Sequence, residues 1–189
     1  YDTAVVGGGP AGLTAAIALA ASGANTALLA RRVPYADNRT TALLGASVDL
    51  LERLDVWPRC REQAAALRTM RLVDDTGRLI RAPEVRFSSD EIGLEQFGFN
   101  IDNRSLMVAL EARAAELSNL TRFDDEAATI DPQDSIVAVA TGKGDHLAAR
   151  DLAVSGHRVV LINRDIKPGG IAEYGIYPEK HTMKHGLRK

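Results

Sequence analysis

The sequence predicts an α/β fold built on a parallel sheet, and three features near the N-terminus indicate this class. A short apolar run at residues 2–6 ends directly in a glycine-rich turn at residues 7–12. An alanine-rich stretch at residues 13–22 follows, closed by Gly23, and a second apolar run occupies residues 25–30. Strand, turn, helix and strand thus succeed one another with short connections, which is typical of a βαβ unit with parallel strands.

Further elements are predicted downstream of this unit. Apolar side chains recur at helical spacing over residues 43–57 and 104–118, which favours two more helices. Residues 70–74 and 79–82 flank a turn signal at residues 75–77 and predict a hairpin. Short strands are expected at 97–101, 120–123, 127–130 and 136–140, with a turn at 131–134. A small antiparallel extension is therefore expected beside the parallel sheet.

Composition and charge narrow the function classes. The 189 residues are 46% hydrophobic and 25% charged, as in a globular chain, and a net charge of -2 argues against a nucleic-acid surface. The single cysteine, Cys60, cannot form an internal disulfide and indicates a reducing compartment. No apolar run approaches the roughly 20 residues that span a bilayer. We expect no transmembrane segment and a location in the cytoplasm or at the periphery of a membrane.

The turn at residues 7–12 matches the pattern G-x-G-x-x-G between a strand and a helix, the context that dinucleotide binding requires. Gly7 permits the tight turn, Gly9 lets the backbone approach a pyrophosphate, and Gly12 allows helix and strand to pack closely. The helix N-terminus presents free N–H groups and a partial positive charge to the phosphates. A dinucleotide site is therefore predicted here.

The type of dinucleotide is left open by the residues that follow. An acid that binds the ribose is expected at the end of the second strand, but Ala30 stands there, followed by Arg31 and Arg32. Two guanidinium groups suit a 2'-phosphate, so an NADP-binding dehydrogenase domain is one hypothesis. A nucleotide-binding module without redox chemistry is another.

Two stretches, residues 2–13 and 37–43, resemble the ubiquinone-biosynthesis aromatic hydroxylases, which are FAD-dependent class A monooxygenases. Residues 45–57, 81–85 and 92–95 are similar too, so the resemblance covers about residues 1–150. It implies a Rossmann-like FAD-binding domain over residues 1–150. In intact relatives NAD(P)H reduces the flavin, and oxygen hydroxylates an aromatic small molecule.

The resemblance also implies which residues hold the cofactor. Gly7, Gly9 and Gly12, with Pro10 and Ala11 between them, would bind the FAD pyrophosphate. The neighbouring positions Ala30 and Arg31 would lie near the adenosine ribose, although Ala30 departs from the usual acid. Arg39 matches an arginine that reaches the flavin side, and Asn103 stands where relatives often carry Arg or Gln. The flavin carries the chemistry, so no catalytic residue is assigned.

The resemblance ends near residue 150, where relatives continue into a Gly-Ala-Asp-Gly segment that closes on the FAD. Residues 151–189 instead resemble part of glutamate-synthase-like and ferredoxin-NADP-reductase-like flavoproteins, and form a tail of different origin. Residues 158–163 read as a strand within it. Residues 140–145 are a weak match to a second glycine loop. We expect an incomplete fold, from a fragment or a fusion, that does not turn over; a fusion that folds poorly is a further hypothesis. The oligomeric state is open.

Four other groups of residues are assigned no function. His181 and His185 stand at helical spacing but lack further metal ligands, so no metal site is predicted. Arg59 and Arg61 would lower the pKa of Cys60 if they faced it, yet a lone thiol without a base is more often inert. The acidic runs at residues 74–75 and 124–126 are interpreted as solvated turn carboxylates.

Overall fold

The two apolar runs at the N-terminus form β1 (Thr3–Val6) and β2 (Thr26–Leu29), and α1 (Pro10–Ala21) connects them. The computed structural model describes residues 1–150 except 33–37, 78–80 and 134–135. The chain divides into two compact units, one formed by residues 1–34 with the chain from Leu110 onward, and the other by residues 35–109. The division falls inside α3 (Asn103–Glu116), which begins in the second unit and ends in the first.

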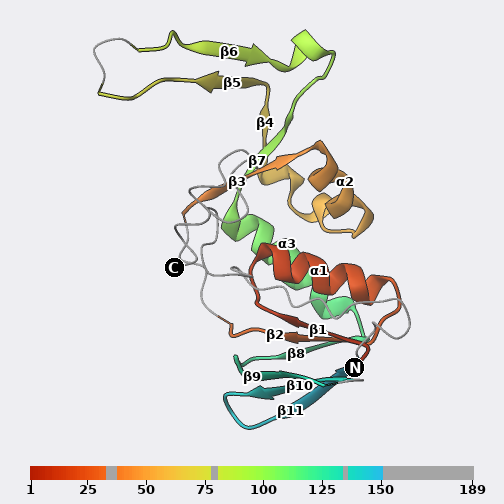
Figure 1. The fold of residues 1–189 in the computed structure, drawn as a ribbon. Coiled ribbons are helices and arrows are strands. Elements are labelled where there is room, and N and C mark those ends of the chain that lie inside the picture. Colours follow the sequence, from red (N-terminus) through yellow and green to blue (C-terminus); the bar gives the residue numbers. More distant parts are fainter. Residues whose placement is uncertain (33–37, 78–80, 134–135, 151–189) are drawn as a thin grey trace. The chain divides into compact units, whose positions relative to one another are not determined.

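A parallel sheet of order β1-β2-β8 is the centre of the first unit, with β8 at Leu120–Phe123. Val5 lies opposite Leu28 in the β1–β2 pair, and β8 pairs in parallel with the other edge of β2. Every side chain of β2 is buried, as expected for a strand covered on both faces. α1 covers one face and buries Leu13 and Ile17 completely (Figure 1). The predicted α/β class with a parallel sheet is confirmed.

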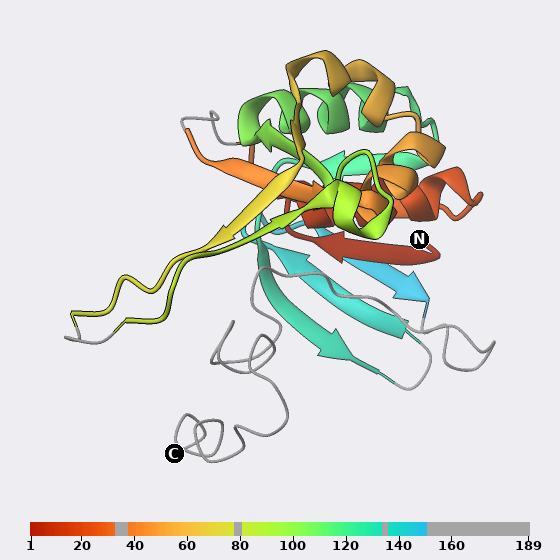
Figure 2. The same cartoon turned by 90° about the horizontal axis from the view of Figure 1, so that it is seen from above.

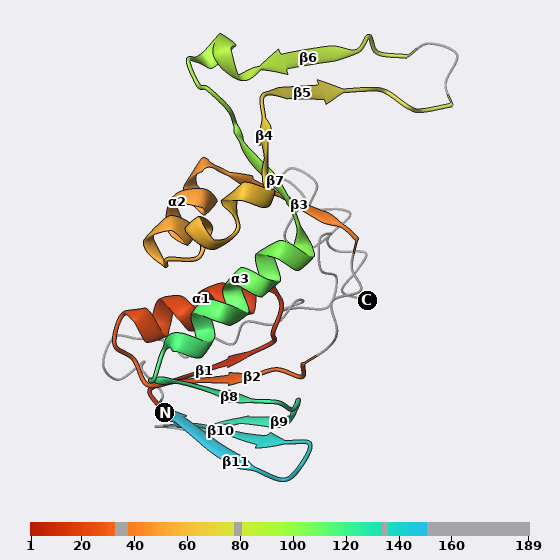
Figure 3. The same cartoon turned by 180° about the vertical axis from the view of Figure 1, so that it is seen from behind.

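The opposite face of this sheet packs against an antiparallel sheet of order β11-β10-β9 (Figures 1 and 3). Its strands are β9 (Ala127–Pro132), β10 (Ile136–Thr141) and β11 (His146–Arg150). The two sheets share one core of apolar side chains, namely Ala4, Ala27, Leu29, Val137, Val139, Leu147 and Ala149. Full burial of each larger aliphatic side chain contributes about 1.5–3 kcal/mol, so this interface holds the first unit together. The predicted antiparallel extension is present.

The second unit contains an antiparallel sheet of order β3-β7-β4, formed by Thr40–Leu44, Gly98–Asp102 and Ala65–Leu67. The prediction of a helix from residue 43 is wrong at its start, because Leu43 pairs with Phe99 and α2 runs only over Gly45–Arg53. The strands approach closely there: a Cβ on Gly98 would lie 2.0 Å from the Leu43 carbonyl oxygen.

Short 3-10 helices follow α2 at Trp57–Arg59 and Arg61–Gln63, and a third lies at Ser89–Ile92. The Trp57 ring packs on Phe99 with the ring centroids 5.1 Å apart. This contact ties the segment after α2 to the central strand of the sheet.

A two-stranded hairpin of β5 (Thr69–Leu72) and β6 (Val85–Ser88) completes the second unit (Figure 2). The predicted hairpin is present, but its second strand lies beyond residues 79–82; of these, 79 and 80 lie outside the described residues. The Asp74 carboxylate explains the longer loop, because it accepts the N–H groups of Thr76 and Ala82, each at 3.0 Å. Within the part of the chain that the structure describes, no helix is long and apolar enough to cross a bilayer.

Candidate cofactor-binding site

The turn between β1 and α1 is fixed by its glycines, each for a different reason. Gly7 has a φ of 115°, in the region that favours glycine, and its N–H donates to the Leu29 carbonyl over 2.9 Å. A Cβ on Gly12 would lie 2.0 Å from the Gly7 carbonyl oxygen, so a side chain has no room between helix and strand. A Cβ on Gly9 would meet no atom within 4 Å. The turn is thus closed at Gly7 and Gly12 and open at Gly9.

The start of α1 at this turn is suited to bind an anion. Gly9 is the N-cap residue, with φ −74° and ψ 177°, and no side chain of the described residues caps the helix. Pro10 occupies the first turn, where its missing N–H costs nothing, and the first turn holds no acidic residue. The unpaired N–H groups of a helix start favour phosphate, and the exposed Gly9 leaves room for it.

The carboxyl end of β2 lies against this turn. Ala30 is buried, and its N–H donates to the Phe123 carbonyl over 3.0 Å. A Cβ on Gly8 would lie only 2.6 Å from the Ala30 Cβ and 3.5 Å from Nη2 of Arg122. The structure therefore brings the glycine turn, Ala30 and Arg122 together. Gly8 and Arg122 were not predicted from the sequence, because neither is a fixed position of the glycine pattern.

Both arginines after β2 have acidic partners. Arg31 forms an ion pair with Glu126 at 3.1 Å, and the two side chains are 68% and 57% exposed. The backbone N–H of Arg32 donates to the Asp124 carboxylate over 2.6 Å. A surface pair of this exposure contributes at most about 1 kcal/mol, so the Arg31 guanidinium can exchange its partner for a ligand phosphate.

Arg39, expected on the flavin side, and Asn103, the other predicted cofactor-binding residue of this region, lie together in the second unit. The Asn103 N–H donates to the Arg39 carbonyl over 3.0 Å, and the Thr41 hydroxyl donates to the Asn103 side-chain oxygen. Asp102 accepts the Ser105 N–H over 2.8 Å at the start of α3, and hydrogen bonds from Ser105 lower the pKa of the Asp102 carboxyl. The other predicted site residues belong to the first unit, namely Gly7, Gly9, Pro10, Ala11, Gly12, Ala30 and Arg31.

A family model described as FAD binding domain matches residues 1–150. The chain belongs to this family. The glycine turn of the first unit fits the cofactor that the family name states, since the turn offers an open backbone position at a helix N-terminus.

Solved structures with the same fold support the architecture of this FAD binding domain. One is p-nitrophenol 4-monooxygenase PnpA from Pseudomonas putida, with a TM-score of 0.64 and 19% identity over 79% of this chain and 39% of that one. The Diels-Alderase PyrE3 has a TM-score of 0.62 and 21% identity, over 79% of this chain and 31% of its own. A variant of 2-methyl-3-hydroxypyridine-5-carboxylic acid oxygenase has a TM-score of 0.59 and 23% identity, over 78% of this chain and 37% of its own. The FAD binding domain thus spans well under half the length of each of these proteins.

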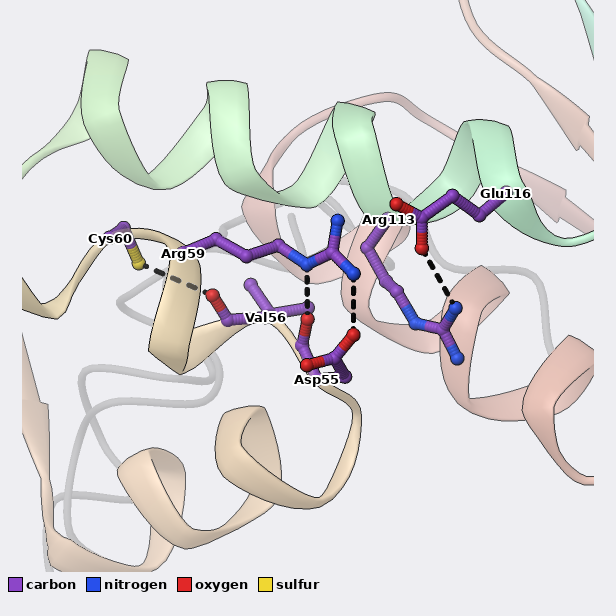
Figure 4. A network of polar contacts seen from close by, with 6 residues as sticks. All are labelled: Asp55, Val56, Arg59, Cys60, Arg113 and Glu116. Atoms are coloured by element: carbon purple, nitrogen blue, oxygen red, sulfur yellow. Dashed lines mark hydrogen bonds and ion pairs between the residues drawn. The ribbon is translucent and has the colours of Figure 1, made fainter.

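The surroundings of Cys60 in this FAD binding domain make its thiol unreactive. Cys60 is 1% exposed, and its thiol donates to the Val56 carbonyl over 3.7 Å (Figure 4). Burial, and secondly the charge of Asp102, raise the pKa of Cys60 to about 11. Arg59 does not activate it, because its guanidinium is bound to Asp55 through the backbone carbonyl at 2.6 Å and the carboxylate. These surroundings agree with the interpretation of Cys60 as a packed, inert thiol.

Residues 140–145 do not form a second glycine loop in this FAD binding domain. They end β10 and turn into β11 as a tight antiparallel hairpin, in which the Thr141 N–H donates to the Asp145 carbonyl oxygen over 2.8 Å and Gly144 has a φ of 95°. A dinucleotide loop leads from a strand into a helix, and a strand follows here instead.

One acidic run also differs from its interpretation as solvated turn residues. Asp125 is 7% exposed, and its carboxylate accepts the Lys143 N–H over 2.7 Å, which lowers its pKa. Among the described residues, no group of three His, Cys, Asp or Glu side chains is placed to hold a metal ion. His181, His185, the predicted strand at 158–163 and the rest of residues 151–189 lie outside the described residues.

Proposed function

We propose that this chain is the FAD-binding part of a flavin-dependent monooxygenase that hydroxylates an aromatic ring. The observation that carries the proposal is the glycine turn, closed at Gly7 and Gly12 and open at Gly9, in a chain that belongs to the FAD binding domain family. The bound flavin would supply the redox chemistry, and the protein would position and shield it.

The residues of this chain would then share the work of binding. Gly7, Gly9, Pro10, Ala11 and Gly12 would hold the pyrophosphate at the start of α1, and the end of β2 at Ala30 and Arg31 would face the adenosine ribose. Arg39 and Asn103 would contribute on the flavin side. NAD(P)H is proposed as the reductant.

Two further considerations support an aromatic substrate. Two of the proteins with this fold carry names that state oxygenation of a ring, p-nitrophenol 4-monooxygenase and the pyridine carboxylic acid oxygenase. The resemblance of residues 2–13 and 37–43 to ubiquinone-biosynthesis hydroxylases supports that subtype. The Diels-Alderase with the same fold is a reminder that fold alone does not fix the reaction.

The substitution Gly9→Asp tests the proposal. The N-cap backbone of Gly9 is extended, and aspartate is a preferred N-cap residue, so the variant is expected to fold. Its carboxylate would stand where a pyrophosphate must bind and would repel it. The matched control is Gly77→Asp, because a Cβ on Gly77 also meets nothing within 4 Å.

Absorbance of the purified chain, with and without added FAD, is the measurement. Flavin bands that co-elute with the wild type and with Gly77→Asp, but not with Gly9→Asp, are the expected result. A colourless wild type that binds NADPH would favour the NADP hypothesis, since Arg31 and Arg32 follow β2. A wild type that binds neither would refute the proposal.

A further inference from the structure

Arg122 lies against the back of the glycine turn, held there by an acidic partner. It stands on β8 opposite Leu28 of β2, and its Nη1 donates to both carboxylate oxygens of Glu111 on α3. The two side chains are only 12% and 24% exposed. Nη2 donates to the Ala30 carbonyl over 3.4 Å and lies 3.5 Å from the Cβ position of Gly8. One guanidinium thus binds the residue after β2 and lies in the space that a side chain at position 8 would approach.

This ion pair is poorly explained by stability alone. Two partly buried charges lose part of their hydration, and well-packed apolar residues often serve as well or better in such places. The Nε of Arg122 is also fully buried without a hydrogen-bond partner among the described residues. What an apolar side chain does not offer is a planar group that donates to a carbonyl through Nη2 while Nη1 is held by a carboxylate.

The Ala30 carbonyl lies directly after β2, where a nucleotide ribose is expected to bind. The end of the second strand is where a dinucleotide-binding fold normally presents an acid to the ribose, and Ala30 has no side chain to do so. A ribose bound at this point would therefore have to be held by the backbone. The peptide that follows the Ala30 carbonyl also sets the direction of Arg31.

We propose that Arg122, anchored by Glu111, is a positioning residue for the adenosine end of FAD, because its Nη2 donates to the Ala30 carbonyl next to the glycine turn. The inference rests on the proposed function and deepens it. It gives the partly buried Arg122–Glu111 ion pair the role of orienting the backbone at Ala30, where the usual acid is missing.

The test compares three ligands with three variants. Arg122→Met removes the guanidinium but leaves the partly buried Glu111 carboxylate without that arginine, so the double variant Arg122→Met/Glu111→Leu removes both charges and is expected to fold. The control is Arg113→Met, which breaks an ion pair with the exposed Glu116 (3.1 Å) elsewhere on α3 (Figure 4). Dissociation constants are measured for FAD, for ADP as the adenosine half and for FMN as the flavin half.

Both Arg122 variants are expected to bind FAD and ADP about tenfold more weakly, with FMN binding unchanged, as is usual when a supporting residue of a binding site is lost. Arg113→Met should bind all three like the wild type. A double variant that regains wild-type affinity for FAD and ADP would overturn the inference, as would an equal loss for all three ligands. A wild type that binds neither FAD nor ADP would refute the proposed function as well, so the two failures are distinguishable.

Discussion

Single residues of the glycine turn differ in what they contribute. Gly12 is required by close contact between backbones, because a Cβ there would lie 2.0 Å from the Gly7 carbonyl oxygen. Gly9 is open and has backbone angles that other residues adopt. We therefore expect Gly12 to be needed for folding and Gly9 for binding, although the two glycines are only three positions apart.

Gly12→Ala is expected to destabilise the first unit by about 1–3 kcal/mol or more, the usual cost of inserting a methyl group into a packed site. Gly9→Ala serves as the control and should lose no more than about 1 kcal/mol, since alanine is only a poorer N-cap. Urea unfolding of the two variants beside the wild type measures the difference. Equal destabilisation by both substitutions would contradict the packing argument.

Cys60 should react slowly with alkylating agents near pH 8. A pKa of about 11 against an ordinary value of 9.0 lowers the thiolate fraction about 100-fold, and burial hinders access further. The native fold favours the neutral thiol, so its stabilising effect is present below pH 9 and is lost as the pH rises through about 11. Iodoacetamide labelling in buffer and in urea measures this, and equal rates in both would show the prediction to be wrong.

At the scale of elements, the β5–β6 hairpin is amphipathic. Met70 lies opposite Phe87 and Leu72 opposite Val85, all four of them exposed, while Arg71 lies opposite Arg86 on the other face. Like charges in direct opposition destabilise a strand pair. Glu84 compensates, because its carboxylate accepts hydrogen bonds from Arg71 at 2.7 and 2.9 Å and from Arg86 at 2.6 Å.

Glu84→Gln is therefore expected to loosen this hairpin selectively. The two arginines lower the pKa of Glu84 to about 2, so its effect is present above its ordinary pKa of 4.5 and is lost as the pH falls through about 2. NMR shifts of the β5 and β6 amides should move toward random-coil values in the variant, and in the wild type only near pH 2. Unchanged amide shifts in the variant would exclude this role for Glu84.

The elements also indicate where the sequence was informative. The βαβ unit and β10 were predictable, because continuous apolar runs bounded by turn residues depend little on partners. Leu43 was misassigned because its spacing suits a helix, whereas its pairing with Phe99 is a contact between distant parts of the chain. β4 has three residues, too few to carry a periodic signal, and the burial of Asp125 depends on the distant Lys143.

Across the whole molecule, only the part of the site formed by consecutive residues could be predicted from the sequence. The glycine pattern and the expected roles of Gly7 and Gly12 agree with the backbone. No sequence pattern pointed to Arg122 or Gly8, because Arg122 is brought near Gly8 only by the pairing of β2 with β8. Arg39 and Asn103 were brought together by the antiparallel pairing of β3 with β7, which places Thr40 opposite Asp102.

Binding and turnover are expected to separate in this chain. The match covers only 39% of p-nitrophenol 4-monooxygenase and 31% of the Diels-Alderase, so most of each of those chains lies outside the compared region. We expect the 189-residue chain to bind FAD without coupled hydroxylation. Oxygen uptake with NADPH and a set of phenols measures this; NADPH consumption coupled to a phenolic product would refute it.

The long separation between the strands of the first unit also bears on how the protein is synthesised. Ala30 meets Arg122 across 92 positions of the chain. At typical elongation rates the ribosome needs on the order of 5 to 20 s to cover that distance. During this interval the edge of β2 that later pairs with β8 has no neighbouring strand, and an unpaired strand edge is a ready template for pairing with another polypeptide.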